Sequence, residues 1–207
     1  MFPLNVPNVL TVLRILLVPV LVVALTTETK NGDTIAAIVF AFASLTDGLD
    51  GYIARSRKSI TTFGKVMDPI ADKMLITAAL IALVSLDRLA AWVAMVIVAR
   101  EFAVSSLRVA AAAEGAIIPA SILGKVKTVI QVVAVMALIV ADNPHAFWVD
   151  VLVGAMVVAT VVSGIDYFLN VRREIEQARA NLRAQREARA GVETSRSSSS
   201  SREVPRM

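Results

Sequence analysis

The chain has 207 residues, of which 57% are hydrophobic and 18% are charged, and its mean hydropathy is +0.70. A soluble globular domain is roughly 45–50% apolar, so lipid is the expected solvent. The net charge of +4 does not indicate nucleic acid binding, because many basic residues lie in short segments between long apolar runs. The absence of cysteine excludes disulfides, thiolate nucleophiles and cysteine zinc sites.

Six segments have the composition of membrane-spanning helices, which need about 20 mostly apolar residues. In chain order they are Pro7–Thr26, Thr34–Ala54, Pro69–Leu86, Leu89–Ala113, Val126–Ala141 and Phe147–Val171. The first is not interpreted as a signal peptide, because no basic residue precedes it and Arg14 lies inside it. The sequence therefore predicts an all-α, polytopic membrane protein with six transmembrane helices.

Basic residues accumulate in alternate connections between these segments. They occur in residues 56–68, at Lys125 and Lys127, and at the start of the tail, at Arg172. The other connections have little or no positive excess. Because positive connections stay on the cytoplasmic side, the pattern predicts that both termini are cytoplasmic.

The composition changes after the last apolar segment. We therefore predict a six-helix transmembrane domain over residues 1–171 and a charged, Ser-rich cytoplasmic tail over residues 172–207. The tail is rich in Arg, Glu, Ala and Gln up to Ala190, which indicates a solvated helix, and the serine run 197–201 favours disorder. The tail could bind anionic lipid heads or only improve solubility.

Four aspartates form the most informative pattern. Asp47 and Asp50 are spaced i, i+3 and Asp68 and Asp72 are spaced i, i+4, so each pair projects from one face of its helix. Placing several carboxylates together in a membrane segment costs free energy, and a bound divalent cation would neutralise their charge. All-oxygen ligation favours Mg²⁺ or Mn²⁺, and magnesium takes substrate phosphates as further ligands. The pattern predicts a metal site for a phosphorylated substrate.

Small and basic residues accompany the aspartates. Gly51 and Gly64 permit close approach either of a ligand or of a neighbouring helix. Arg55 could donate two hydrogen bonds to a phosphate or serve as a cytoplasmic flanking charge. The only histidine, His145, lies in a polar connection, so a general base would be a carboxylate or, less readily, a lysine.

The residues from Asp47 to Asp72 follow the order D-x2-D-G-x2-A-R-x8-G-x3-D-x3-D. This order resembles the signature of the CDP-alcohol phosphatidyltransferases without a departure. The resemblance implies a six-helix fold, a cytoplasmic-facing active site in a bacterial inner membrane, two divalent metals, a CDP-linked lipid donor and a homodimer. It also implies residue roles: metal ligation by Asp47, Asp50, Asp68 and Asp72, catalytic base action by Asp72, and CDP binding by Gly51, Ala54 and Arg55.

Further segments resemble the phosphatidylglycerophosphate synthases of this family. They are residues 7–14, 100–108, 124–131 and 163–167. The implied acceptor, glycerol 3-phosphate, carries about two negative charges and needs cations that the aspartates do not supply. The candidates are Arg100, Arg108, Lys125 and Lys127. The lysines could instead set topology, and Arg100 could pair with Glu101 or another acid.

Asn8, Thr11 and Arg14 could contact the CDP group or form structural bonds between helices. The predicted reaction joins CDP-diacylglycerol and glycerol 3-phosphate to give phosphatidylglycerophosphate and CMP, with Asp72 accepting the proton of the primary hydroxyl. The alternatives are another acceptor such as inositol phosphate, an ion-coupled transporter and a non-catalytic scaffold. Neither repeats nor broken helices indicate a transporter, and a scaffold leaves the aspartates without a reason.

Overall fold

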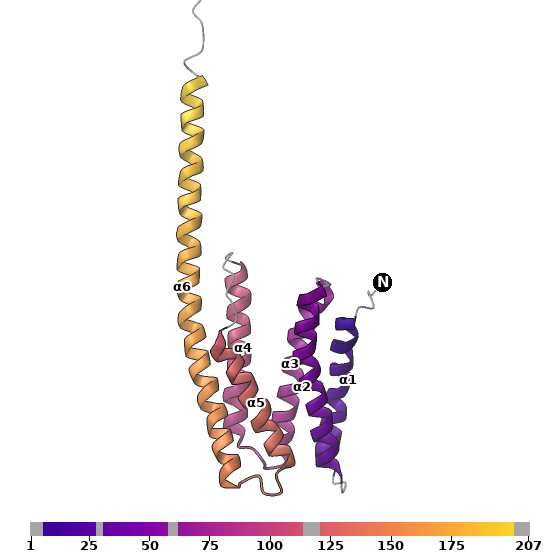
Figure 1. Ribbon diagram of the computed structural model, residues 1–207. Coiled ribbons are helices and arrows are strands. Elements are labelled where there is room, and N and C mark those ends of the chain that lie inside the picture. Colours follow the sequence, from indigo (N-terminus) through magenta and orange to yellow (C-terminus); the bar gives the residue numbers. More distant parts are fainter. Residues whose placement is uncertain (1–5, 28–30, 58–61, 114–120, 201–207) are drawn as a thin grey trace, which may run out of the picture. The chain divides into compact units, whose positions relative to one another are not determined.

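The computed structural model describes residues 6–27, 31–57, 62–113 and 121–200, with side chains except at residues 6–8, 47–57, 62–69, 72, 177–179 and 181–200. Within these ranges the chain is helical between short connections and contains no strand. The helices are α1 (Val6–Thr26), α2 (Gly32–Arg57), α3 (Thr62–Ser85), α4 (Ala91–Ala113), α5 (Ile122–Val140) and α6 (Phe147–Ser200) (Figure 1). The prediction of an all-α fold is confirmed for this part of the chain.

Two helices, α3 and α6, extend furthest beyond their predicted apolar segments. The α3 helix begins at Thr62, well before the predicted start at Pro69, because its first turns are polar and a search for apolar runs passes over them. The α6 helix continues past Val171 to Ser200, through the helix-forming Arg, Glu, Ala and Gln residues of the tail and into the serine run for which the sequence favours disorder. The division into a membrane domain and a tail remains a prediction.

Three described helices are long and apolar enough to cross a membrane: Val9–Thr26, Ile122–Val140 and Phe147–Glu176. The described parts of α2 and α3 contain shorter apolar stretches, Gly32–Thr46 and Lys73–Ser85. The first stretch ends just before Asp47 and the second begins just after Asp72, the first and last residues of the aspartate signature. The six predicted spans and the cytoplasmic termini therefore remain predictions.

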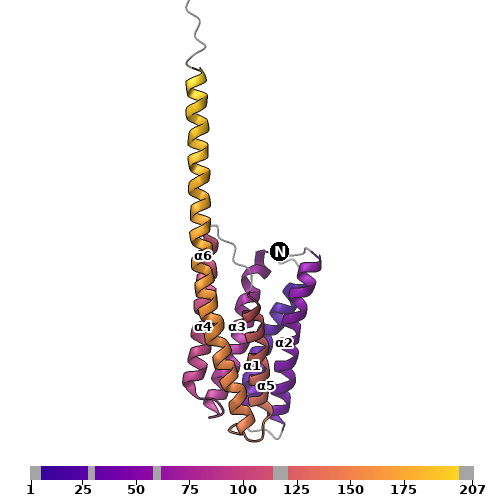
Figure 2. The ribbon, with the colours of Figure 1, turned by 60° about the vertical axis from the view of Figure 1, so that its left-hand side comes forward.

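The chain divides into two compact units. Unit 1 comprises residues 1–102 and 122–163, and unit 2 comprises residues 103–121 and 164–207. In unit 1, α1 packs against α2 and α3, and α5 packs against α2 and α3, so these helices lie side by side (Figures 1 and 2). In unit 2, Val104 and Ala111 pack with Tyr167 and Val171.

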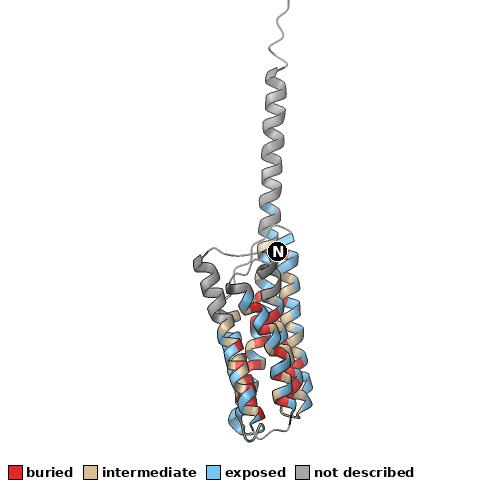
Figure 3. Cartoon of the chain, turned by 90° about the vertical axis from the view of Figure 1, so that its right-hand side faces the viewer, coloured by how far each residue is buried: buried red, intermediate tan, exposed pale blue. Residues whose placement is uncertain are grey.

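The core of unit 1 consists of Leu, Ile, Val and Ala side chains together with Met156 and one aromatic residue, Phe40, which is fully buried. Buried positions recur along its helices, and exposed positions lie beside them (Figure 3). Many exposed residues are also large and apolar, including Leu16 at 60%, Ile38 at 64% and Ile81 at 61%. Apolar exposure along successive helices is the pattern expected of a protein whose outer surface contacts lipid.

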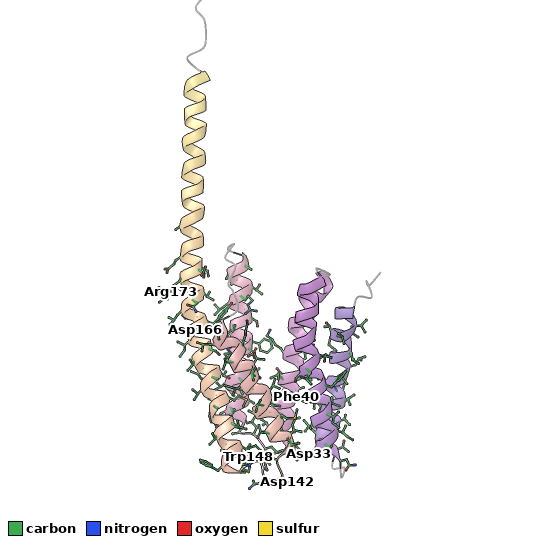
Figure 4. The ribbon with its side chains drawn as sticks, in the orientation of Figure 1. Asp33, Phe40, Asp142, Trp148, Asp166 and Arg173 are labelled. Carbon is green, nitrogen blue, oxygen red and sulfur yellow. The ribbon has the colours of Figure 1, made fainter. Side chains whose placement is uncertain are left out.

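One end of unit 1 is held by a turn and an ion pair. Asp87 has a φ of 55° and follows α3 in a Schellman motif, in which Arg88 N donates to Leu83 O at 2.9 Å and Asp87 N donates to Val84 O at 3.1 Å. The Arg88 guanidinium donates to Asp33 at 2.7 Å and to Ile139 O at 3.1 Å. Asp33 lies at the same end as Asp142 and Trp148 (Figure 4).

Candidate active site

Unit 1 contains a cavity of about 70 Å³ whose walls combine apolar and polar side chains. Its polar lining comes from four helices: Ser44 of α2, Lys73 of α3, Glu101 of α4, and Lys127, Thr128 and Gln131 of α5. Charged and amide side chains inside a helical bundle of this apolar composition are costly to bury, and they commonly mark a functional site. The cavity is therefore the first candidate for substrate binding in the described part of the chain.

Helix register places this cavity beside the aspartate signature. Ser44 precedes Asp47 by three residues on α2, and the cavity residue Leu75 follows Asp72 by three residues on α3. Three residues of α-helix rise about 4.5 Å. The two helices run in opposite directions (Figures 1 and 2), so the cavity lies about one turn from the signature positions on both.

Two charged residues that line the cavity, Glu101 and Lys127, form a cluster with Arg100. Arg100 Nη1 donates to Glu101 Oε1 at 3.1 Å, and Lys127 Nζ donates to the same oxygen. The side chains are 14%, 19% and 5% exposed for Arg100, Glu101 and Lys127. Two cations share one carboxylate, so these three groups together carry one positive charge in excess. An anionic ligand would complement that charge.

Several buried polar atoms beside the cluster have no hydrogen-bond partner among the described residues. They are Arg100 Nε, Ser44 Oγ, and both Nε2 and Oε1 of Gln131. Arg100 is otherwise well held, since its Nη2 donates to Ser163 Oγ at 3.1 Å. Buried polar atoms are nearly always paired in folded proteins, so this concentration points to a ligand or to ordered water at the cavity.

The predicted acceptor cations have different surroundings. Lys127 is buried and pairs with Glu101. Arg100 also pairs with Glu101, as one of the two interpretations of the sequence predicts. Lys125 is exposed. Arg108 belongs to unit 2, where its Nε lies 3.5 Å from Tyr167 Oη and its guanidinium carbon lies 5.7 Å from the centre of the Tyr167 ring. The structure thus brings two of the four cations together.

The remaining candidates lie mostly outside the described side chains. Thr11 is described, and it is buried in α1 with 1% exposure. The described side chains include no group of three or more His, Cys, Asp or Glu that could hold a metal. The side chains outside the described part are those of Asn8, Asp47, Asp50, Gly51, Ala54, Arg55, Asp68 and Asp72.

Three neutral polar residues of the cavity, Ser44, Thr128 and Gln131, were not candidates in the sequence analysis. Gln131 belongs to the segment 124–131 that carries a family resemblance, and Ser44 lies outside all such segments. The signal that could have found them is an uncharged polar residue in an apolar helix, placed one turn from a signature residue in the case of Ser44. Gln131 similarly lies one turn beyond Lys127 on α5.

The fold and this cavity define an all-helical protein with membrane-length helices and a charged internal site. Residues 4–165 match the CDP-alcohol phosphatidyltransferase family. The chain belongs to this family of enzymes, and the prediction from the aspartate signature is confirmed.

Three similar proteins carry the name CDP-diacylglycerol–glycerol-3-phosphate 3-phosphatidyltransferase. The protein of Bacillus subtilis (strain 168) is 41% identical over 180 residues, which cover 79% of this chain and 93% of that protein. The protein of Rickettsia felis is 38% identical over 169 residues, with coverage of 79% and 93%. The protein of Pseudomonas fluorescens is 39% identical over 152 residues, with coverage of 70% and 77%.

Proposed function

We propose that the protein transfers the phosphatidyl group of CDP-diacylglycerol to glycerol 3-phosphate, giving phosphatidylglycerophosphate and CMP. The observation that carries the proposal is the similarity along most of the chain to proteins named for this activity. The charge cluster of Arg100, Glu101 and Lys127 supports it independently, because its excess positive charge suits a phosphate on the acceptor.

The chain offers a donor set suited to divalent metal. Asp47 and Asp50 belong to α2, Asp68 and Asp72 belong to α3, and these helices contact each other. Four carboxylates at helical spacing form an all-oxygen set, which fits Mg²⁺ or Mn²⁺. When bound, two such ions would neutralise charge on the pyrophosphate of the donor and on the departing CMP.

The protein residues would position and deprotonate the acceptor. Asp72 would accept the proton of the primary hydroxyl as its oxygen attacks the phosphorus that bears the diacylglycerol. The bond between that phosphorus and the CMP oxygen breaks, and CMP leaves with the bonding electrons. Lys127 and Arg100 would hold the acceptor phosphate, with Arg108 and Lys125 as further candidate cations. Thr11, with Asn8, Gly51, Ala54 and Arg55, would contact the CDP group.

The membrane arrangement is part of the same proposal. Six spans with cytoplasmic termini, in a bacterial inner membrane, would place the aspartate signature on the side where both nucleotide and glycerol 3-phosphate are found. The three membrane-length helices support an integral membrane protein. A homodimer, which the family resemblance implies, remains a prediction.

The direct test is acceptor choice by the purified protein. We expect CMP release from CDP-diacylglycerol with glycerol 3-phosphate and Mg²⁺, and little release with inositol phosphate. The substitution Lys127→Gln should raise the acceptor KM about ten- to a hundredfold, because a charge-assisted phosphate contact contributes about 1.5–3 kcal/mol. The exposed neighbour Lys125 provides a matched comparison, and Lys125→Gln should have a smaller effect. Preference for inositol phosphate would refute the proposed acceptor.

A further inference from the structure

The cavity contains buried, uncharged polar atoms without hydrogen-bond partners among the described residues, and a neutral polar group of a ligand would pair with them. Gln131 is 2% exposed, and both its carboxamide nitrogen and its carboxamide oxygen lack a partner among the described residues. Ser44 lines the same cavity, and its Oγ also has no hydrogen-bond partner among the described residues. A carboxamide and a hydroxyl together offer donors and acceptors without charge, which is the complement of an alcohol.

Glycerol 3-phosphate has one polar group that the proposed function leaves without a protein contact. Its phosphate would bind the cations, and its primary hydroxyl would face Asp72 and react. The secondary hydroxyl, on the central carbon, lies between them. Lys127 lines the cavity, and the cavity residue Leu75 lies about one helical turn from Asp72 on α3.

We propose that Gln131 and Ser44 bind the secondary hydroxyl of the acceptor and thereby determine which phosphorylated alcohol reacts. The inference rests on the proposed function and names the residues that would determine its acceptor specificity. The cavity of about 70 Å³ supports it. Because one water requires about 10–15 Å³ on such a scale, the space holds several water-sized groups and can accept a hydroxyl-bearing carbon of the acceptor.

The test compares glycerol 3-phosphate with 3-hydroxypropyl phosphate, which lacks only the secondary hydroxyl. CMP release from CDP-diacylglycerol is measured for the unaltered protein and for Gln131→Leu. The unaltered protein should favour glycerol 3-phosphate by about tenfold or more in kcat/KM, because the analogue leaves buried polar groups unpaired. Gln131→Leu should lose most of its activity toward glycerol 3-phosphate but little toward the analogue, so that the ratio approaches one.

Two further variants provide a second test and a control. Ser44→Ala should reduce the same ratio and provides a second measurement if Gln131→Leu does not fold. Thr128→Val should preserve the ratio, because the Thr128 hydroxyl already donates to Gly124 O at 3.0 Å although the residue lines the cavity.

The outcomes separate this inference from the proposed function. Equal use of both acceptors by the unaltered protein would overturn the inference and leave the proposed function standing. Equal loss toward both acceptors in Gln131→Leu and in Ser44→Ala would also overturn it, because the two residues would then serve packing or bind water only. Absence of CMP release with glycerol 3-phosphate in the unaltered protein would overturn the proposed function together with this inference.

Discussion

The carboxylate of Glu101 is the single anion in a cluster with Arg100 and Lys127, so Glu101→Gln should destabilise the protein strongly. The substitution keeps the volume of the side chain and removes its charge. Two cations would then remain close together in a site where their side chains are only 14% and 5% exposed. The mutual repulsion of these cations and their incomplete hydration would oppose folding.

The magnitude follows from the burial of the cluster. Removing one partner of a buried ion pair costs about 3–5 kcal/mol, and the partial exposure of Glu101 favours a value of about 3 kcal/mol. For a protein of this size, about 3 kcal/mol corresponds to a decrease of roughly 6–12 °C in the melting temperature. Circular dichroism of the protein in detergent, recorded during heating, measures this decrease.

A double-mutant cycle isolates the contact between Glu101 and Lys127. Lys127→Gln alone should cost less than Glu101→Gln, because Glu101 keeps Arg100 as a partner. The double variant should be more stable than the sum of the single losses predicts, by about 1–3 kcal/mol. Additivity within about 0.5 kcal/mol would refute the reasoning. Glu176→Gln is the control, because the pair of Glu176 with Arg172 is 69% and 75% exposed and should contribute less than about 1 kcal/mol.

Three other predictions test the chemistry and the fold. Chelation of divalent metal should abolish CMP release, and added Mg²⁺ or Mn²⁺ should restore it; full activity in excess chelator would contradict a carboxylate metal site. Asp72→Asn should lower kcat by about a hundredfold or more while CDP-diacylglycerol still binds, whereas near-normal turnover would assign the base elsewhere. Asp87→Gly should raise the free energy of unfolding by about 0.5–1 kcal/mol, because Asp87 adopts a φ of 55° that glycine tolerates better; an unchanged or lower melting temperature would show that the Asp87 side chain compensates that strain.

The sequence was sufficient to predict the helices and the family. Long apolar runs between polar connections give helices in lipid or in a protein core, so the type and order of the helices followed from composition. Helix ends were less predictable where polar residues continue the helix, as in the first turns of α3 and in α6 beyond Val171. Fixed spacing made the aspartate signature recognisable without any knowledge of tertiary contacts.

The partners of the basic residues depend on tertiary packing, which the sequence does not show. Lys125 and Lys127 are two residues apart and therefore point about 200° apart around a helix of 3.6 residues per turn. The sequence shows that they differ in direction but not which one faces the protein interior. Tertiary packing decides this, since Lys127 is buried against Glu101 of another helix and Lys125 is exposed.

The charged cluster also explains why composition alone undercounts helices that line a polar site. The α4 helix carries Arg100, Glu101 and Arg108, and it is not among the three described segments that satisfy a criterion of length and hydropathy. Yet Arg100 and Glu101 bond to each other, Arg100 bonds to Ser163, and Glu101 bonds to Lys127 of α5. Pairing inside the protein lowers the cost of placing such charges at membrane depth. A helix that supplies a charged site must carry charged residues, and these lower its mean hydropathy. The absence of α4 from those three segments is therefore compatible with the predicted span. It also accords with a functional role for α4.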